Sequence, residues 1–583
     1  MTDRLRTLEN IEVSEREQLN EVQNAPACAE DGQSENEQKN GSEEISENTE
    51  TKTEESANTD NNDVKKKVKR IGVAALILSA GIMCSRLLGF VRDAVIAYQA
   101  GAGAATDAYN AAFLLPDLMN HFLAGGTLAI TFIPLFSEYI SKDQPKKAER
   151  LFSLIATTMG SLLLVAIVLC LVFTTQLVEL LFPGFDAAQV HDTVSMTRII
   201  LPGQFFHYIG ALMMAVLMAR GQFVPSAMAP LIYNLMIIIF GLVFGRTLGM
   251  QGFAIGALVG AILGPFMLPV IFLRKKIKYQ PVFGFRDADF KKYILLTLPL
   301  MLGASLTTVD EWVGRILGSM MAAGSISCLN YARRLVLVPI ALVGQAAGQA
   351  ALPYLSQLSA KGDMPAVADT LHKTLKNVIL LSMIMIGFFV VLADPMVSLV
   401  YERGAFQAED AHRTAMVLRI LAGSIVFWTI QMVSVRAFYA AQNTLVPMIL
   451  TTVATAISIP IYYLMSVQYG LYGLAVASCI GMALQSSCIV LFYHRKNNHF
   501  KPLKLLKALG IGLVLGSCAG GGCYAGLKIV GLLGIESHLM RLLFELGVSG
   551  IIGVICVVCV SFLLIPEELK GFAGKVRRKV LKR

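Results

Sequence analysis

The stretch that decides the fold runs from Ile71 to Ala100 and reads IGVAALILSAGIMCSRLLGFVRDAVIAYQA. It is long and apolar enough to cross a bilayer as a helix, which takes about 20 apolar residues. Yet it carries Ser85, Arg86, Arg92 and Asp93 well inside its length. An arginine at the centre of a spanning helix costs roughly 2.5–3.5 kcal/mol, so these charges need partners or water. Two interpretations are open: a buried ion pair that orders a helix bundle, or a cationic, water-filled cavity.

Spacing and charge favour the cavity. Arg86 and Asp93 are seven residues apart and share a helix face, while Arg92 points about a third of a turn away. Later apolar stretches also carry more arginines than carboxylates at depth.

Composition is that of a polytopic membrane protein: of 583 residues, 55% are hydrophobic and only 16% are charged. Residues 1–63 hold 18 acidic and 5 basic side chains, whereas the rest of the chain holds 23 acidic and 45 basic ones. Most of these bases flank or enter apolar stretches, which favours a membrane and argues against nucleic acid as a partner.

We therefore predict an all-α polytopic membrane protein with fourteen transmembrane helices. The predicted spans are 71–98, 106–137, 148–174, 194–218, 223–245, 251–273, 292–320, 326–356, 370–399, 411–440, 445–467, 471–494, 503–531 and 541–565. Alternate connections are basic (65–70, 142–150, 274–292, 361–376, 494–507 and 570–583), and basic connections stay on the cytoplasmic side. Both termini are then cytoplasmic.

An internal repeat divides these spans. Pro134-Leu-Phe-Ser matches Pro353-Tyr-Leu-Ser, Phe223-Val-Pro matches Leu445-Val-Pro, and Gly252-Phe-Ala matches Gly473-Leu-Ala, at offsets of 219, 222 and 221 residues. An offset over six spans keeps the orientation, so the two halves are parallel repeats. The predicted domains are a disordered acidic tail with a basic collar (1–70), an N-lobe of spans 1–6 (71–274), a C-lobe of spans 7–12 (292–494), spans 13 and 14 (503–565) and a basic tail (566–583).

Span 2 carries Pro116, Asn120 and His121. Pro116 removes a backbone hydrogen bond and kinks the helix, which makes it a candidate hinge. Either the kink is a structural hinge with polar caps, or it turns Asn120 and His121 into the cavity.

Spans 7 and 8 carry further charges. Glu311 and Arg315 are four residues apart in the favourable order, which predicts a local ion pair. Asp310 is then left without a local partner, and it either holds a cation or pairs with Arg333 across the lobe interface. Arg333 and Arg334 are adjacent and cannot share one local carboxylate. Together with Arg436 in span 10, the arginines outnumber the acids, and the planar guanidinium suits phosphate. This predicts a carrier for an anionic, phosphorylated substrate.

Other chemistries lack their motifs. The sequence has no Walker loop, no HExxH and no GxSxG. Cys556 and Cys559 form a CxxC inside an apolar run without a second pair, which predicts lipid-facing or packed thiols and no metal. We expect no enzyme activity and no cofactor, and the drive is left to membrane potential, a cation gradient or downstream consumption.

Several motifs resemble the MurJ (MviN) family of lipid II flippases, within the multidrug/oligosaccharidyl-lipid/polysaccharide exporter superfamily. They are Ser85-Arg-Leu-Leu-Gly-Phe-Val-Arg-Asp93, Gly101-Ala-Gly-Ala-Ala-Thr-Asp107-Ala-Tyr, Ala112-Phe-Leu-Leu-Pro116, Phe132-Ile-Pro134, Tyr331-Ala-Arg-Arg334-Leu and Arg436-Ala-Phe-Tyr-Ala440. The resemblance implies a V-shaped pair of lobes around a central cationic cavity, with a lipid-tail groove along spans 13 and 14. It places Arg86, Arg92, Asp93, Asp107, Ser327 and Arg334 on cavity positions.

The chain departs from the family pattern in two places. Where the family usually has two arginines and then a glutamate after the span-2 proline, this chain has Asn120, His121 and Gly125. Arg333 stands where the family has an aspartate. Positive charge has therefore moved from span 2 to span 8, or the recognised head group differs.

The resemblance implies a multi-pass bacterial inner-membrane protein that flips lipid II, the undecaprenyl-pyrophosphate-linked peptidoglycan precursor, for cell-wall synthesis. The alternatives are a flippase for another polyprenyl-linked glycan, a cation-coupled drug antiporter, and a scaffold that recruits cell-wall synthesis proteins through residues 1–63.

Overall fold

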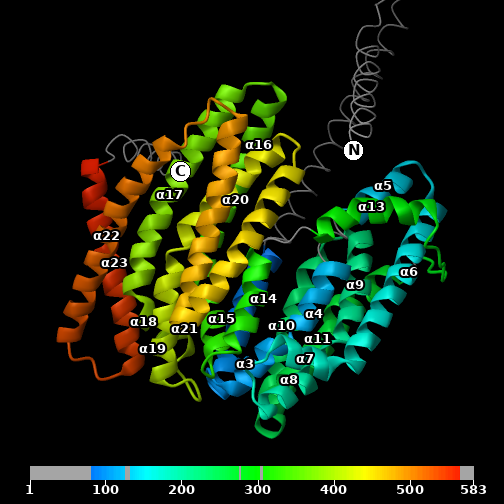
Figure 1. Cartoon of the computed structure of the whole chain (residues 1–583), viewed down its shortest axis with the longest axis horizontal. Helices are drawn as coiled ribbons and strands as arrows, with labels where there is room; N and C mark the ends of the chain where they lie inside the picture. Colours follow the sequence, from blue (N-terminus) through cyan, green and yellow to red (C-terminus); the bar gives the residue numbers. More distant parts are fainter. Residues whose placement is uncertain (1–79, 125–130, 275–276, 303–305, 565–583) are drawn as a thin grey trace, which may run out of the picture. The chain divides into compact units, whose positions relative to one another are not determined.

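The computed structural model describes residues 80–124, 131–274, 277–302 and 306–564, and every regular element there is helical (Figure 1). The predicted tails, the basic collar and Gly125 lie outside these residues. The all-α prediction is confirmed for the described part of the chain.

The N-lobe begins with a helix over residues 80–100. It continues with α3 (Ala104–Ala112), α4 (Leu114–Met119), the π-helical turn η1 (Asn120–Ala124), α5 (Ile133–Ser141), α6 (Pro145–Val172), α7 (Thr174–Leu181), α8 (Ala187–Ile200), α9 (Gly203–Ala219), α10 (Val224–Leu248), α11 (Met250–Ala261), η3 (Ile262–Met267) and α12 (Leu268–Leu273). Its core is built from contacts of α10 with α11, of α3 with α8 and of α6 with α9.

The C-lobe comprises α14 (Leu306–Gly318), α15 (Ser325–Pro339), η4 (Ile340–Gln345), α16 (Ala346–Ala360), α17 (Met364–Val391), α18 (Ala393–Tyr401), α19 (Ala408–Ala422), α20 (Ile425–Ala440) and α21 (Leu445–Lys496). Two further helices, α22 (Leu503–Leu532) and α23 (His538–Leu564), pack on each other and lie against α17 and α18 (Figure 1). They form the extra pair that the sequence places outside the repeat.

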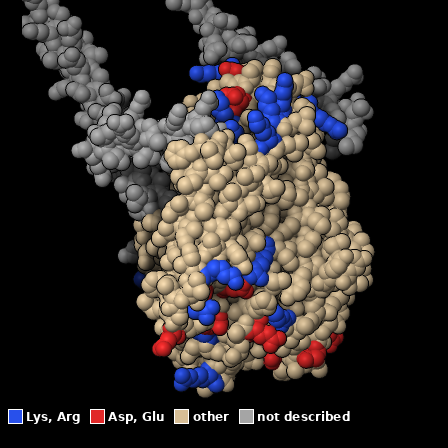
Figure 2. All heavy atoms as spheres, turned by 90° about the vertical axis from the view of Figure 1, so that its left-hand side faces the viewer, with Lys and Arg blue, Asp and Glu red and all other residues tan. Residues whose placement is uncertain are grey.

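Nine described helices are long and apolar enough to cross a membrane, or ten if the bent pair α19–α20 is one span. One of them, α21, contains two predicted spans, because Gly470 breaks it with a left-handed φ of 57°. Predicted spans 1, 2, 7 and 14 each include residues outside the described part, so the count of fourteen stays a prediction. Figure 2 shows a band free of Lys, Arg, Asp and Glu between two charged ends, and Lys and Arg predominate at its upper end.

The internal repeat is visible in the backbone. The π-helical turns η1 and η4 begin 220 residues apart, at Asn120 and Ile340. Residues with left-handed φ also recur at matched offsets, in the pairs Gly101 and Gly324, Asp143 and Gly362, Gly221 and Gln442, and Gly249 and Gly470. Positive φ at matched positions is what two parallel repeats predict.

Predicted span 7 is divided between the lobes. Its first half, α13 (Ala288–Leu302), contacts α6 and η1, and Phe290 and Tyr293 join the N-lobe core. Its second half, α14, packs on α21 and α15. The predicted C-lobe boundary at residue 292 therefore does not describe α13, because hydropathy reports the length of a span and not its neighbours.

Candidate functional site

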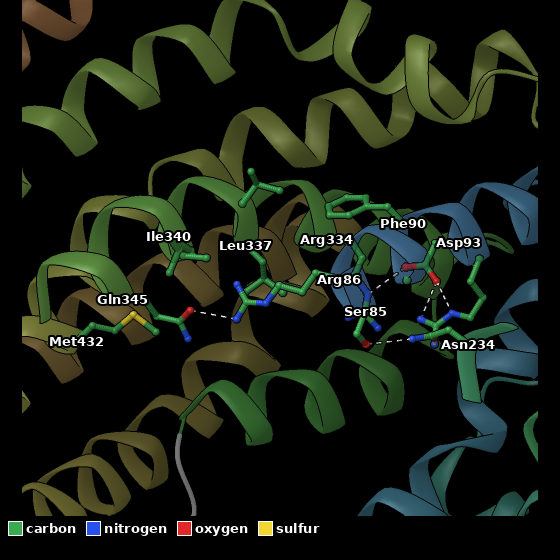
Figure 3. Close-up of a pocket in the computed structure, with 14 residues that line it drawn as sticks. Ser85, Arg86, Phe90, Asp93, Asn234, Arg334, Leu337, Ile340, Gln345 and Met432 are labelled. Atoms are coloured by element: carbon green, nitrogen blue, oxygen red, sulfur yellow. Dashed lines mark hydrogen bonds and ion pairs between the residues drawn. The ribbon is translucent and has the colours of Figure 1, made fainter. Parts of the chain in front are cut away.

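A cavity of about 410 Å³ lies between the helix over residues 80–100 and α15 with η4 (Figure 3). Its charged lining side chains are Arg86, Arg92, Asp93 and Arg334. Three arginines thus surround one carboxylate, and the lining carries a net charge of about +2, as the arginine excess in the sequence suggests.

Asp93 is the centre of this arrangement and is buried. Its Oδ1 accepts hydrogen bonds from Nε and Nη2 of Arg92, at 3.0 and 2.8 Å. Its Oδ2 lies 3.2 Å from Nε of Arg334, which comes from the other lobe, in an ion pair without hydrogen-bond alignment. One carboxylate therefore orients two guanidinium groups, including that of Arg92, its neighbour in sequence.

Polar groups hold the other two sides of the cluster (Figure 3). Arg86 Nη2 donates to Gln345 Oε1 across the cavity at 3.0 Å. Arg92 Nη1 donates to Asn234 Oδ1 at 3.0 Å, and the Asn234 amide in turn donates to Ser85 Oγ at 3.5 Å. Because Arg86 meets only a neutral amide in this set, it retains the capacity to bind an anion.

A second cavity of about 230 Å³ shares Arg92, Asp93 and Arg334 with the first. Its other charged residues are Asp117, Glu311 and Arg315, so positive and negative side chains balance there. The excess positive charge therefore belongs to the first cavity.

The predicted local pair of Glu311 with Arg315 is wrong. Arg315 Nη1 instead bonds Asp117 Oδ2 at 2.6 Å, from α14 to α4. The favourable four-residue spacing was outweighed by a carboxylate that the other lobe places opposite Arg315.

The lobes also meet beyond these cavities, at a seam formed by residues 98–107 with 323–331 and 404–410. Asp107 Oδ2 accepts from Gly324 N at 2.7 Å, and Oδ1 accepts from Ser327 N and Oγ at 2.8 and 2.6 Å. Helix starts leave such amide groups without partners and favour negative charge. Asp107 of one lobe thus caps α15 of the other, and neither Asp107 nor Ser327 lines the two cavities.

Glycine makes this close approach possible. Gly324 has a φ of +86°, and a Cβ there would stand 2.0 Å from Ala102 O. Gly101 and Gly404 are also left-handed and would clash with backbone across the seam. Ala405 N donates to Tyr98 O at 2.8 Å, so backbone bonds directly to backbone between the lobes.

Arg333 faces away from both cavities. It is buried in the C-lobe, and its Nη2 lies 2.5 Å from Asp310 Oδ2. Asp310 also accepts hydrogen bonds from the hydroxyl groups of Tyr462 and Ser478 on α21. We expected Arg333 to contact the cavity, and it lines neither cavity. Asp310 has Arg333 as its cationic partner, which is one of the two alternatives left open for Asp310.

Span 2 breaks where Pro116 requires it. A proline at 116 cannot donate to the carbonyl of Ala112, and α3 ends at that residue. The freed Ala112 carbonyl accepts from Thr197 Oγ1 of α8 at 3.4 Å. Beyond the break, Asn120 is exposed. The His121 and Trp312 rings pack edge to face with their centroids 5.2 Å apart.

Asn120 and His121 line neither cavity, contrary to the cavity-facing expectation. Asn234 and Gln345 do line the first cavity, and the sequence analysis did not single them out. Each is an amide within an apolar run, Asn234 alone and Gln345 followed by Gln349, which is the signal that would have found them.

The site groups charged side chains with neutral amides. Among the described residues, no three His, Cys, Asp or Glu side chains are grouped to hold a metal ion. Convergent guanidinium groups with neutral amides suit a multivalent oxyanion.

A family described as "Lipid II flippase MurJ" matches residues 96–544. The chain belongs to the MurJ family. A flippase moves a lipid across the membrane, so the members of this family are transporters and not enzymes. Apolar helices around an arginine cluster agree with that description. A probable lipid II flippase MurJ of Bdellovibrio bacteriovorus is 28% identical over 437 residues, which cover 73% of this chain and 82% of that protein. The Haemophilus influenzae protein of the same name is 25% identical over 74% of this chain and 89% of its own length.

Solved structures agree on the fold. A structure titled "Lipid II flippase MurJ, inward closed conformation" has a TM-score of 0.70 at 22% identity, covering 85% of this chain and all of that one. An inward-facing multidrug resistance MATE transporter of the MOP superfamily has a TM-score of 0.60 at 16% identity, covering 73% and 98%. These likenesses confirm the predicted fold, while the likeness to MATE carries no information on substrate.

Proposed function

We propose that this chain flips lipid II from the inner to the outer leaflet of the bacterial cytoplasmic membrane by alternating access. The observation that carries the proposal is the interlobe cavity where Arg86, Arg92 and Arg334 surround Asp93. The MurJ family membership supports lipid II as the substrate. A cavity for cationic drugs needs the opposite sign of charge, so the antiporter alternative is disfavoured.

The pyrophosphate is the group that the arginines recognise. Arg86 offers its guanidinium without breaking an ion pair, whereas Arg92 and Arg334 exchange Asp93 for phosphate oxygens. Charge-assisted hydrogen bonds of this kind contribute about 1.5–3 kcal/mol each. The exchange weakens the Asp93–Arg334 contact that joins the lobes, and so couples binding to lobe movement.

The seam then acts as the outer gate. Basic connections on one side of the membrane orient the chain with both termini in the cytoplasm and the Asp107 seam outside. Opening requires the α15 amide groups to leave the Asp107 carboxylate for water. The lipid tail stays in the membrane along α22 and α23, and Pro116 allows the α3–α4 break to flex.

The energy source is the membrane potential in this account. A potential of 100 mV is worth about 2.3 kcal/mol for each charge that crosses it. A negative interior drives the net anionic complex outward and returns the empty cationic cavity inward.

Complementation tests the function. The resident lipid II flippase is depleted in a bacterium that expresses this chain, and survival and outer-leaflet lipid II are measured. We expect rescue with exposure by the natural chain and by Arg198→Gln, an arginine that is exposed on α8, but not by Arg86→Gln with Arg334→Gln. Rescue by the double variant would contradict the pyrophosphate site.

The altered span 2 motivates one second candidate, a flippase for another polyprenyl-pyrophosphate glycan. Asn120 and His121 replace charges that the family usually carries after the proline. Competition distinguishes the two: purified lipid II blocks transport of the labelled glycan only if both lipids share the arginine cluster.

A further inference from the structure

The segment over residues 277–287 connects the N-lobe to α13 and packs along the first turns of α6. Its backbone donates from Lys278 N to Glu149 Oε1 at 3.3 Å, and from Gln280 N to Ser153 Oγ at 3.1 Å. Gly284 N donates to Thr158 Oγ1 at 3.3 Å, which marks the deepest point along α6.

The segment then returns toward the start of α6. Arg150 Nη2 pairs with Asp287 Oδ2 at 2.5 Å. Residues 277–287 thus run along α6 to the level of Thr158 and return toward its start. We call this loop the wedge, and the contacts above hold both of its arms on α6.

Aromatic side chains project from this wedge into solvent-accessible space. Tyr279, Phe283 and Phe285 are 54, 59 and 54% exposed, although Val282 packs inward on the N-lobe core. The Phe283 and Phe285 rings lie 5.6 Å apart and flank the tip at Gly284. Exposed aromatic residues grouped at a loop tip mark an interaction surface.

The tip lies next to the lipid-facing part of α6. Residues 151–160 of α6 are mostly buried, whereas an exposed apolar stripe begins at Leu162. Leu162 is four residues beyond Thr158, or about 6 Å along the helix. The aromatic tip is therefore at the depth where lipid head groups meet acyl chains, the position that aromatic belts occupy.

The wedge has acidic neighbours, Glu149, Asp287 and Asp289, but its exposed charges without an ion pair are basic. Asp287 is neutralised by Arg150, and Asp289 accepts a hydrogen bond from Tyr139 at 2.7 Å. Lys278 and Arg286 are exposed and form no ion pair among the described residues. Aromatic rings beside unpaired cations are complementary to an anionic lipid surface.

We propose that residues 277–287 form a membrane-interface anchor whose aromatic tip inserts among the head groups of an anionic leaflet. Phe283 and Phe285 enter the interface, and Lys278 and Arg286 contact lipid phosphates. Because the wedge is bonded to α6, it fixes the N-lobe in depth at the link that leads to the C-lobe. The anchor is independent of the transported substrate.

Tryptophan quenching tests the anchor in the full chain. The two native tryptophans are replaced (Trp312→Phe and Trp428→Phe), and Phe283→Trp is the reporter. Leu164→Trp in the α6 stripe and Lys361→Trp in the α16–α17 connection serve as membrane and aqueous references. Each protein is reconstituted in vesicles of phosphatidylcholine, with or without phosphatidylglycerol, carrying brominated acyl chains.

We expect bromolipid to quench the residue-283 reporter far more than the aqueous reference, with roughly twofold stronger quenching when phosphatidylglycerol is present. Lys278→Gln with Arg286→Gln should abolish the phosphatidylglycerol effect and leave the Leu164→Trp signal unchanged. If acrylamide quenches the reporter as strongly as the aqueous reference and bromolipid does not, the wedge faces water and a protein partner replaces the lipid. Quenching that is equal in both lipid mixtures would overturn the anionic specificity.

Discussion

Arg333 and Arg334 are neighbours in sequence with opposite surroundings. Consecutive helical residues point about 100° apart, so one faces the C-lobe core and the other faces the cavity. Arg333 is held by buried Asp310, whereas Arg334 reaches Asp93 of the other lobe. One sequence motif therefore supplies both a buried ion pair of the C-lobe and a charge that lines the cavity.

Substituting each arginine should separate these roles. Arg334→Gln should lower transport by about tenfold or more, because one charge-assisted contact is lost, while the melting temperature in detergent changes little. Arg333→Gln should destabilise the protein by roughly 3–5 kcal/mol, because Asp310 is left as a buried, unpaired charge. Thermal melting and lipid II exposure are measured on both variants; the reverse pattern would contradict the assignment.

Gly324 should be as sensitive as the arginines. Gly324→Ala strains a left-handed residue by roughly 1–2 kcal/mol and drives a methyl group against Ala102 O. We expect the seam to open and the buried thiol of Cys328 to react faster with a thiol reagent, followed by peptide mass spectrometry. Gly221→Ala is the matched control, since Gly221 is also left-handed but has open space around its Cβ. Equal Cys328 labelling in both variants would argue against a closed seam.

The sequence predicts which residues carry charge at depth, but not which of them meet. Arg86, Arg92, Asp93 and Arg334 line the first cavity as expected. Arg315 found its partner 198 positions away in the chain. Such a partner depends on how two lobes dock, which no local spacing encodes.

At the scale of elements, the breaks in helices matter as much as the helices. Apolar length predicts most spans well, and Pro116 predicts the break between α3 and α4. The division of span 7 into α13 and α14 was missed, because the apolar length of a span does not report which lobe covers each half.

Removing the proline tests the break. Pro116→Ala supplies an amide donor for the Ala112 carbonyl, so α3 and α4 should merge into one straighter helix with unchanged or higher stability. Transport should fall several-fold, because the merged helix is stiffer. Pro145→Ala is the control, since a proline in the first turn of α6 deprives no carbonyl of its donor. Unimpaired transport by Pro116→Ala would remove the hinge role.

At the scale of the whole molecule, two repeats enclose a cavity whose lining carries more positive than negative side chains, unlike the balanced second cavity. The repeat was detectable from three short matches, and residues with left-handed φ recur at nearly the same offsets. The net charge of the cavity depends on both lobes.

The membrane potential should therefore affect transport. In vesicles with a potassium gradient and valinomycin, an interior-negative potential should speed the outward movement of lipid II by protein molecules whose cytoplasmic side faces the vesicle lumen. Collapse of the potential should slow this movement. The expected scale is set by about 2.3 kcal/mol per charge at 100 mV. A rate that does not change with potential would point to another energy source.

The arginine cluster is proposed to move lipid II by its pyrophosphate. The most direct measurement is the appearance of labelled lipid II on the opposite leaflet of vesicles that contain the purified chain. We expect exposure by the natural chain and by Arg198→Gln, and loss of exposure with Arg86→Gln and Arg334→Gln at equal protein content. Equal exposure by the double variant, or no exposure by the natural chain while another polyprenyl-pyrophosphate glycan is moved, would contradict it.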